Sequence, residues 1–290
     1  NFLYNFNSIS DLLNYNPLNF VSKIRFLLTT FYLGKFTNHF HYENISAVHW
    51  LTKWAGEDVT NNIWSPLLRV KFGKNYNKIP LTWLIGRIKQ RFYSRKNGDE
   101  TLGYINGSTQ LILDKIIEKL KKKGVKFIKN AKIGSVSDKQ NLILKINNKI
   151  YKNKNIIFTC QNEGIIEIIG NKKPKFTRKL RKIKYLGAIC VVLKLKRNFS
   201  NIYWLNIADQ SAPFGGIIEH TNFVDKKHYK NDHVLYLSKY FDNKDYLYKR
   251  SKKEIFQIAK RFLKRVDPNF NEKLIKNFYI FSSTHAAVLN

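Results

Sequence analysis

Apolar residues in the first third of the chain recur every three to four positions, which is the spacing of an amphipathic helix. This pattern predicts helices over residues 9–13, 18–33, 47–54, 58–68 and 83–92, with Ser46 as the cap of the third. Pro66 should interrupt the fourth, because proline lacks a backbone N–H and crowds the preceding turn. Residues 1–100 are therefore predicted to be mainly helical.

The central stretch, from Gly103 to Cys160, combines one helix with short strands. Apolar residues one turn apart predict a helix that begins with a cap from Ser108 or Thr109 and closes at a left-handed Gly124. Apolar runs after it predict strands over residues 125–128, 133–136, 142–146 and 149–151, and a buried strand over 156–160. Asn147 and Asn148 mark the turn of a hairpin.

The last third has four successive strand patterns separated by turn residues, which favours an antiparallel sheet. The strands are expected over residues 185–195, 203–207, 216–219 and 233–240, and a final strand over 278–281. Ser251 and Glu254 form a capping box for a helix that ends before Pro268. The basic stretch 172–184 is interpreted as a solvated surface connection.

Composition agrees with a globular chain of two domains. The chain has 290 residues, of which 43% are hydrophobic and 14% aromatic, enough for a sizeable core. Cys160 and Cys190 lie in apolar runs and are expected to be buried thiols in a reducing compartment, which favours a cytoplasmic location. No apolar run approaches the roughly 20 residues of a membrane helix. The lack of any Met, even at position 1, indicates an internal piece of a longer protein.

The formal net charge of +32 invites a nucleic-acid interpretation. Two features argue against it: the lysines are spread along the chain, and they accompany many Asn, Ile, Tyr and Phe, which an A/T-rich coding sequence would enrich. Compositional bias is therefore favoured over a nucleic-acid partner, and peripheral contact with an anionic membrane remains open. The sequence does not define an oligomeric state.

The central motifs resemble those of the flavin-containing amine oxidase superfamily, which includes protoporphyrinogen oxidase and phytoene desaturase. The matching segments are Gly103 to Ser108, Gly124-Val125, Ile133 with Val136, and Ile156 to Cys160. Ser108 stands where the family has the second glycine of a pair. A second segment, Ile63 to Gly73, is similar to a "W-x-P-L-L-x-x-K-F-G" phrase in the helical part of the substrate domain of bacterial members.

The resemblance implies an α/β (α+β) fold, in which residues 101–165 form part of a Rossmann-like FAD-binding domain. This part would be inserted between two segments of a substrate domain, a helical one over 1–100 and a sheet with a helix over 166–290. The implied activity is hydride transfer from a small-molecule substrate to FAD, with Ile133 and Thr159 on the adenine side of the cofactor. The glycine fingerprint for the pyrophosphate is not in this sequence, so these residues alone are not expected to hold FAD tightly.

Polar and cationic residues near the expected substrate pocket are the candidates for substrate binding. They are Arg69, Lys71, Trp204, Asn206, Glu219, His220 and Asn222. Arg69 and Lys71 could pair with an anionic substrate, and His220 can titrate near neutral pH. Glu219 and His220 could instead pair with neighbouring backbone or lysine. No catalytic residue is assigned, and no histidine has metal-ligand spacing, so no metal is predicted.

Two other functions stay open from the sequence. One is a non-redox flavin enzyme such as a sugar mutase, in which Arg69, Arg87 or Arg91 would bind a nucleotide diphosphate. The other is a basic module for nucleic acid or an anionic membrane, whose binding should weaken steeply with salt.

Overall fold

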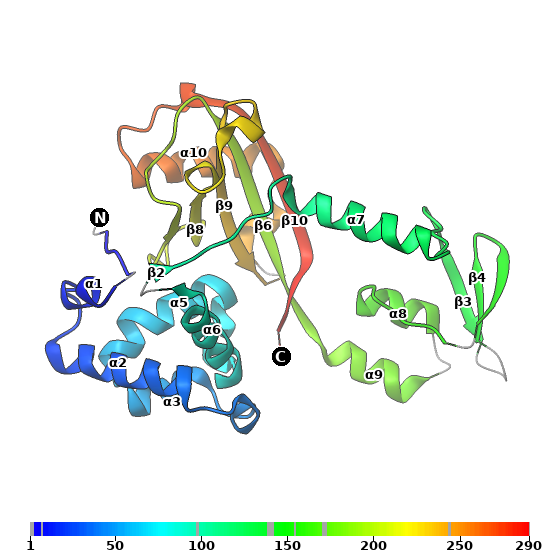
Figure 1. Ribbon diagram of the computed structural model, residues 1–290, viewed down its shortest axis with the longest axis horizontal. Helices are drawn as coiled ribbons and strands as arrows, with labels where there is room; N and C mark the ends of the chain where they lie inside the picture. The colour runs from blue at the N-terminus through cyan, green and yellow to red at the C-terminus, as the bar shows by residue number, and fades with distance from the viewer. Residues whose placement is uncertain are drawn as a thin grey trace. The chain divides into compact units, whose positions relative to one another are not determined.

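The computed structural model describes residues 3–6, 8–96, 99–137, 142–153, 155–169, 173–242 and 245–289. It forms two compact units (Figure 1). Unit 1 comprises residues 1–104 and 186–287, and unit 2 comprises residues 105–185 and 288–290. No helix among the described residues is both long and apolar enough to cross a membrane.

The N-terminal part of unit 1 is helical, as predicted. Its helices are α1 (Ile9–Leu13), α2 (Phe20–Lys35), α3 (Ala47–Trp54), α4 (Glu57–Val59), α5 (Ser65–Phe72) and α6 (Leu81–Tyr93). Ser46 caps α3, since its side chain accepts a hydrogen bond from the His49 N–H. The predicted interruption at Pro66 is confirmed, because a π-helical turn over Thr60–Trp64 precedes α5. A short hairpin of β1 (Arg95–Lys96) and β2 (Asp99–Glu100) follows α6.

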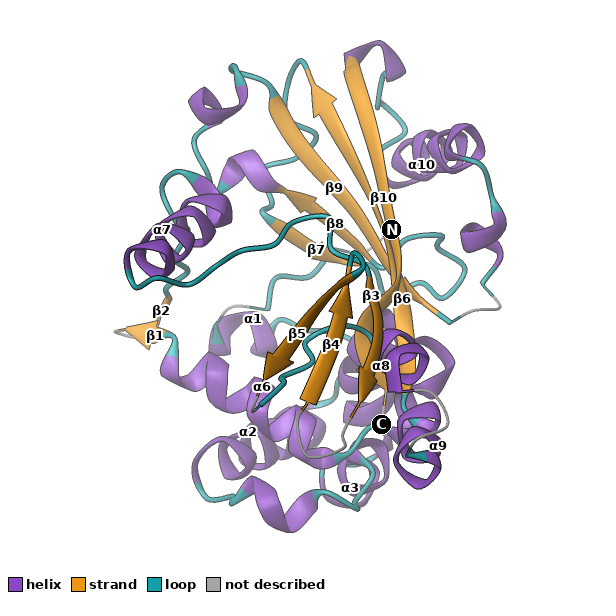
Figure 2. Ribbon diagram, turned by 90° about the vertical axis from the view of Figure 1, so that its right-hand side faces the viewer, coloured by secondary structure: helices purple, strands orange, loops and turns teal. Residues whose placement is uncertain are grey.

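The second part of unit 1 is a five-stranded sheet. Its strands are β6 (Lys184–Leu195), β7 (Trp204–Asn206), β8 (Gly216–Glu219), β9 (His233–Phe241) and β10 (Ile275–Leu289), arranged in the order β10-β6-β9-β8-β7 (Figure 2). The pairs β6–β9, β9–β8 and β8–β7 are antiparallel, which confirms the predicted sheet type. β10 is longer than the predicted strand.

One face of this sheet packs against α10 (Lys252–Val266), which begins at the predicted Ser251–Glu254 capping box. Leu193, Leu235 and Leu237 are fully buried there, and Phe262 and Leu263 of α10 belong to the same core cluster. Burial alternates along β6 from Gly187 to Leu195, and the pairing of β6 with β9 carries the same parity into β9. The odd-numbered residues of both strands therefore face this core, and the even-numbered residues face away from it.

Unit 2 contains α7 (Ser108–Lys122), α8 (Asn162–Ile169), α9 (Pro174–Lys182) and an antiparallel sheet of β3 (Ile133–Ser137), β4 (Leu142–Ile146) and β5 (Lys149–Asn153). α7 ends in a Schellman motif: Gly124 has a φ of 80°, and the Val125 N–H donates to the Leu120 carbonyl. At the start of α7 the Ser108 hydroxyl accepts from the Gln110 N–H. The helix and its closure at a left-handed Gly124 are therefore confirmed, whereas Gly107, and not Ser108 or Thr109, stands at the N-cap position.

Two predicted strands of unit 2 are wrong. Residues 125–128 and 156–160 are not strands, and the side chain of Ile157 is 87% exposed. A strand requires a neighbour to accept and donate its backbone hydrogen bonds, and the described part of the chain offers these segments none. Cys160 is exposed for the same reason, so its predicted burial is wrong, and Cys190 of β6 is only half-buried.

The basic stretch of unit 2 also differs from its prediction. The sequence pattern was typical of a surface connection, yet residues 174–182 form the helix α9. Pro174 begins this helix, where its missing N–H costs nothing. Thr177 is its one buried residue in the described structure.

The secondary structure is therefore α+β, with helices and antiparallel sheets, as the sequence predicted. The Rossmann-like arrangement of unit 2 stays a prediction.

Candidate functional site

The sheet face turned away from α10 carries several polar and aromatic side chains. We call it the open face, and it comprises Ala188, Cys190, Val192, Trp204, Asn206, Gly216, Ile218, Tyr236, Ser238 and Tyr240. Tyr236, Ser238 and Tyr240 alternate with the buried Leu235 and Leu237 on β9, so the period of the strand alone places them together. They are half-buried, in contrast to the leucines on the other side of the strand.

Helix α5 packs against β9 next to this face. An added Cβ on Gly215 would lie 2.9 Å from Val70, so the missing side chain of this glycine lets α5 approach closely. Lys71, the next residue of α5, places its Nζ 5.1 Å from the ring centre of Tyr240 and 5.6 Å from that of Trp83 on α6. Both contacts are within the range of cation–π interactions. α5 thus brings one predicted site residue to the edge of the open face.

Arg87 of α6 joins the same group. Its guanidinium carbon lies 5.4 Å from the Trp83 ring centre, and its Nη1 donates to Gln90 Oε1 at 3.0 Å. Burial, and then the charge of Arg87, lower the pKa of Lys71 below its ordinary value. In the described part of the chain neither cation takes part in an ion pair. We call Lys71, Trp83, Arg87 and Tyr240 the Lys71 cluster; its two like charges favour an anionic ligand.

Arg69 does not reach this cluster. Its Nη2 donates to the Tyr76 hydroxyl at 2.9 Å, and its guanidinium lies 4.3 Å from the centre of the same ring. Residues 69 and 71 are about 200° apart around a helix, so the two cations necessarily project from different sides of α5.

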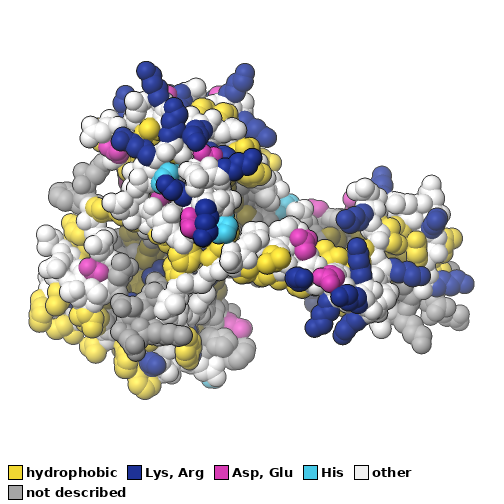
Figure 3. Space-filling view, turned by 45° about the horizontal axis from the view of Figure 1, so that its top comes forward, with side chains coloured by type: hydrophobic (Ala, Val, Ile, Leu, Met, Phe, Trp, Pro, Cys, Tyr) yellow, Lys and Arg dark blue, Asp and Glu magenta, His cyan; other side chains and the backbone are white. Residues whose placement is uncertain are grey.

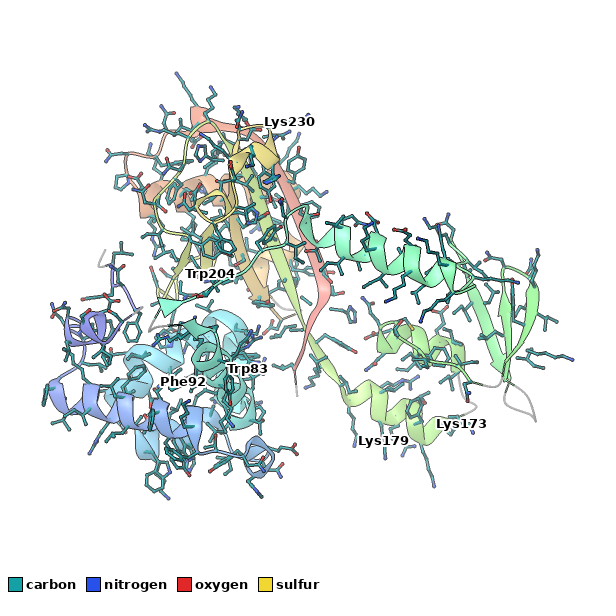
Figure 4. The ribbon with its side chains drawn as sticks, in the orientation of Figure 1. Trp83, Phe92, Lys173, Lys179, Trp204 and Lys230 are labelled. Atoms are coloured by element: carbon teal, nitrogen blue, oxygen red, sulfur yellow. The ribbon has the colours of Figure 1, made fainter. Side chains whose placement is uncertain are left out.

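Trp204 and Asn206 of β7 lie together on the open face. Trp204 Nε1 donates to Asn206 Oδ1 at 3.1 Å, and both side chains are exposed. Figure 4 labels Trp204 on the sheet and Trp83 on α6. Two of the sequence-predicted residues are therefore neighbours on this face.

Glu219 points to the opposite face of the sheet and is buried. Its Oε2 accepts hydrogen bonds from the N–H groups of Phe199 and Ser200 at 3.0 and 3.4 Å, whereas its Oε1 has no partner among the described residues. Burial raises the pKa of Glu219 to about 7, although the two backbone hydrogen bonds oppose this change. This carboxyl group holds the loop after β6 and does not reach the open face.

His220 directly follows β8 and is surrounded by tyrosines. Its Nε2 is 2.6 Å from the Tyr229 hydroxyl, and its ring centre lies 5.2 to 5.4 Å from the ring centres of Tyr104, Tyr229 and Tyr236. Burial lowers the pKa of His220, and burial, followed by interactions with Tyr104, raises the pKa of Tyr229 to about 12. A neutral imidazole bonded to a neutral phenol therefore lies beside Tyr236, which belongs to the open face.

Asn222 lies further along the loop, where its Nδ2 donates to the Ser200 carbonyl at 2.8 Å. Its side chain is exposed. Among the predicted residues, the structure thus brings Trp204 and Asn206 to the open face itself, Lys71 to one end of it and His220 to the other.

Sequence reasoning missed Trp83, Tyr104, Tyr229, Tyr236 and Tyr240 as site residues. The alternation Tyr236-Leu237-Ser238-Lys239-Tyr240 was the available signal for two of them, because it places two tyrosines and a serine on one face of a strand. Trp83, Tyr104 and Tyr229 come from other segments, and only their packing in three dimensions reveals them.

The two residues expected to contact FAD lie in unit 2. Ile133 begins β3 opposite Ile146 and is partly exposed, whereas Thr159 is exposed in a segment that is not a strand. A cofactor cradle needs a strand end and a helix N-terminus that together face the pyrophosphate. The described residues do not form such a cradle at Thr159. The described residues therefore do not by themselves fit FAD.

The arrangement of helices and sheets is shared, over more than nine tenths of the chain, with solved structures of other proteins. Solved structures that match it include oxidoreductases, amine oxidases and a UDP-galactopyranose mutase. The resemblance deduced from the sequence motifs is thus confirmed at the level of the fold.

Three of these structures show how far the likeness extends. An oxidoreductase from Methanosarcina mazei matches with a TM-score of 0.71 and 10% identity, over 94% of this chain and 64% of its own. A protein from an Exiguobacterium species, described as a candidate protoporphyrinogen oxidase, matches with a TM-score of 0.66 and 12% identity, over 98% of this chain and 64% of its own. Reduced UDP-galactopyranose mutase matches with a TM-score of 0.62 and 13% identity, over 93% of this chain and 62% of its own.

The chain therefore spans less than two thirds of the length of these structures. No protein-family profile and no curated protein matches the sequence.

Proposed function

We propose that this chain is the substrate-binding part of an FAD-dependent oxidoreductase, in which a hydride passes from a small-molecule substrate to the flavin. The observation that carries the proposal is the fold, which is shared over more than nine tenths of the chain with an oxidoreductase structure. The open face, with aromatic and polar groups on a rigid sheet, is the kind of surface that orients a substrate, while the redox chemistry belongs to the cofactor.

The Lys71 cluster supports a substrate that carries an anionic group. A half-buried ammonium group with a lowered pKa gains most from a carboxylate or phosphate when no protein carboxylate already pairs with it. Tyr236 and Tyr240 are four residues apart on β9, so the two ends of the open face are separated by about 13 Å. A substrate of that length would meet Lys71 at one end and the tyrosines around His220 at the other.

The test is an absorbance spectrum of the protein expressed from its complete gene, with these 290 residues as the comparison. Flavin bands in the complete protein, which disappear when a substrate is added without oxygen, would support the proposal. A complete protein that is colourless and does not bind added FAD would overturn the proposal.

A non-redox sugar mutase is the second candidate, because reduced UDP-galactopyranose mutase has the same fold and Arg87 is not in an ion pair among the described residues. Arg87 and Arg91 are exposed and one turn apart on α6, whereas Arg69 is already bonded to Tyr76. Titration with UDP distinguishes the two candidates: a mutase should show saturable binding that Arg87→Gln weakens, and an oxidoreductase should not.

A further inference from the structure

Helix α9 is the most concentrated run of positive charge in unit 2. Between residues 173 and 184, Lys or Arg occupies seven of twelve positions, and Asp and Glu are absent. Five of these cations belong to α9 itself, which has nine residues: Lys175, Arg178, Lys179, Arg181 and Lys182. Over residues 105–185 the chain has 21 Lys and Arg against 5 Asp and Glu, so this charge is not balanced nearby.

The packing of α9 turns most of these cations outward. Thr177 is buried and Leu180 half-buried on the side of α8, where Asn162 Nδ2 donates to the Leu180 carbonyl. With about 100° between successive residues, Lys175 and Lys182 project almost directly away from this buried side. Arg178 and Lys179 lie within about 50° of the same direction, and Figure 4 labels Lys179 on the helix.

We call Lys175, Arg178, Lys179 and Lys182 the α9 ridge. All four side chains are exposed, and none has an ion pair or side-chain hydrogen bond within the described structure. Figure 3 shows lysines and arginines on several parts of the face that it draws. On α9, four of them share one face of a single helix. Four unpaired cations on one face repel each other, and an anionic surface would relieve that repulsion.

An aromatic side chain stands beside the α9 ridge. Phe176 is 47% exposed, at the border between the buried side of α9 and the ridge. Aromatic rings next to lysines are typical of helices that lie in the headgroup region of a membrane, where the ring enters the apolar boundary and the ammonium groups stay with the phosphates. The ridge is convex and fits a flat surface, whereas single-stranded nucleic acid is bound in grooves.

We propose that α9 docks unit 2 on an anionic phospholipid surface, with the α9 ridge on the lipid phosphates and Phe176 in the interfacial layer. Charge complementarity selects this partner, since near an anionic leaflet each Lys or Arg strengthens binding about 5-fold. The proposal does not depend on the activity proposed above.

Vesicle binding of the 290-residue chain tests this surface. The probes are vesicles of phosphatidylcholine mixed two to one with phosphatidylglycerol, and vesicles of pure phosphatidylcholine. We expect binding to the mixed vesicles only, weakened by salt. The quadruple variant K175Q/R178Q/K179Q/K182Q should lose more than about 100-fold in partition coefficient, and Phe176→Ser several-fold. Circular dichroism verifies that each variant is folded.

The matched control neutralises four exposed lysines of unit 1 instead, as K249Q/K252Q/K253Q/K264Q. It carries the same net charge as the α9 variant, so equal losses in the two variants would overturn the proposal in favour of diffuse electrostatics. A second outcome would also overturn the proposal. In it, a nucleic-acid oligomer binds tightly to the wild-type chain and to the control but not to the α9 variant, while the α9 variant still binds vesicles as the wild type does. Retention of vesicle binding by the control, with loss in the α9 variant, supports it.

Discussion

The Nζ of Lys71 lies 5.1 Å from the centre of the Tyr240 ring, and this contact joins the helical part of unit 1 to its sheet. Lys71 follows Val70, which packs on Gly215, so the position of the ammonium group is fixed by backbone packing as well as by its own contacts. A cation held this way needs little reorganisation to bind an anion.

Lys71→Gln should therefore weaken the binding of anionic ligands. We expect about a 10-fold increase in the Kd of a small aromatic carboxylate such as benzoate, because the variant loses a charge-assisted contact in a partly buried place. Quenching of tryptophan fluorescence can follow the titration, since Trp83 belongs to the cluster. Arg69→Gln is the matched control and should leave the Kd unchanged, because Arg69 is engaged by Tyr76. Equal effects of the two variants would contradict the assignment.

Glu219 should make unit 1 less stable as the pH rises. Its pKa in the folded protein is about 7, against 4.5 for the ordinary group, so the folded state binds more protons between these values. The contribution of protonated Glu219 to the free energy of unfolding is fully present below pH 4.5. It falls by about 2–3 kcal/mol as the pH rises from there to about 7. In Glu219→Gln this contribution should vanish. Urea unfolding at pH 5 and pH 8 measures it.

The lowered pKa of His220 acts in the opposite direction, since it destabilises the folded state below the ordinary histidine value of 6.5. The comparison must therefore be between wild type and Glu219→Gln at each pH. An identical pH slope in both proteins would show that Glu219 does not titrate abnormally.

The hydrogen bond between Tyr229 and His220 should be important for stability. Tyr229→Phe removes the hydroxyl that lies 2.6 Å from His220 Nε2 and leaves a buried ring nitrogen without that partner. The expected cost is about 1–3 kcal/mol in the free energy of unfolding. Tyr248→Phe is the control, because that exposed ring stacks on Phe241, and its loss of a hydroxyl should change stability by less than about 0.5 kcal/mol.

Gly187 should tolerate no side chain. A Cβ there would contact the Phe241 ring and lie 2.7 Å from the Ser283 carbonyl oxygen, which is backbone and cannot move without disturbing β10. Gly187→Ala should therefore cost about 2–3 kcal/mol. Gly86→Ala, in an open position of α6, should instead stabilise by about 0.5–1 kcal/mol. Thermal unfolding of the two variants measures the difference. If Gly187→Ala and Gly86→Ala had similar Tm values, β6 would not be packed closely on β10 at Gly187.

The sequence was sufficient for the elements whose stability is local. The caps at Ser46 and Ser251, the left-handed Gly124 and the strand alternation in β6 and β9 all depend on neighbours within a few residues. Residues 156–160 have the composition of a buried strand, but a strand also depends on a partner that composition cannot supply. α9 was missed for the converse reason, since its many cations hide the short apolar side that packs on α8.

The candidate site was harder to predict than the fold. Lys71 was predicted because it lies in a phrase similar to one of the substrate domain and because a cation can pair with an anionic substrate. Its partners Trp83 and Tyr240 come from an adjacent helix and a distant strand, and the sequence did not reveal them. Glu219 has the residue type of a catalytic group, yet strand parity places it on the buried side of the sheet, opposite to Tyr236 and Ser238.

The division of unit 1 into two separate stretches of sequence has a consequence for biosynthesis. The helices up to Tyr93 leave the ribosome before the sheet on which α5 packs has been made, because residues 105–185 are synthesised in between. At 5–20 residues per second this delay is roughly 4 to 16 s. During that time Val70 lacks its partner Gly215, so the nascent chain exposes apolar surface that chaperones recognise, and slower translation of unit 2 would lengthen that exposure.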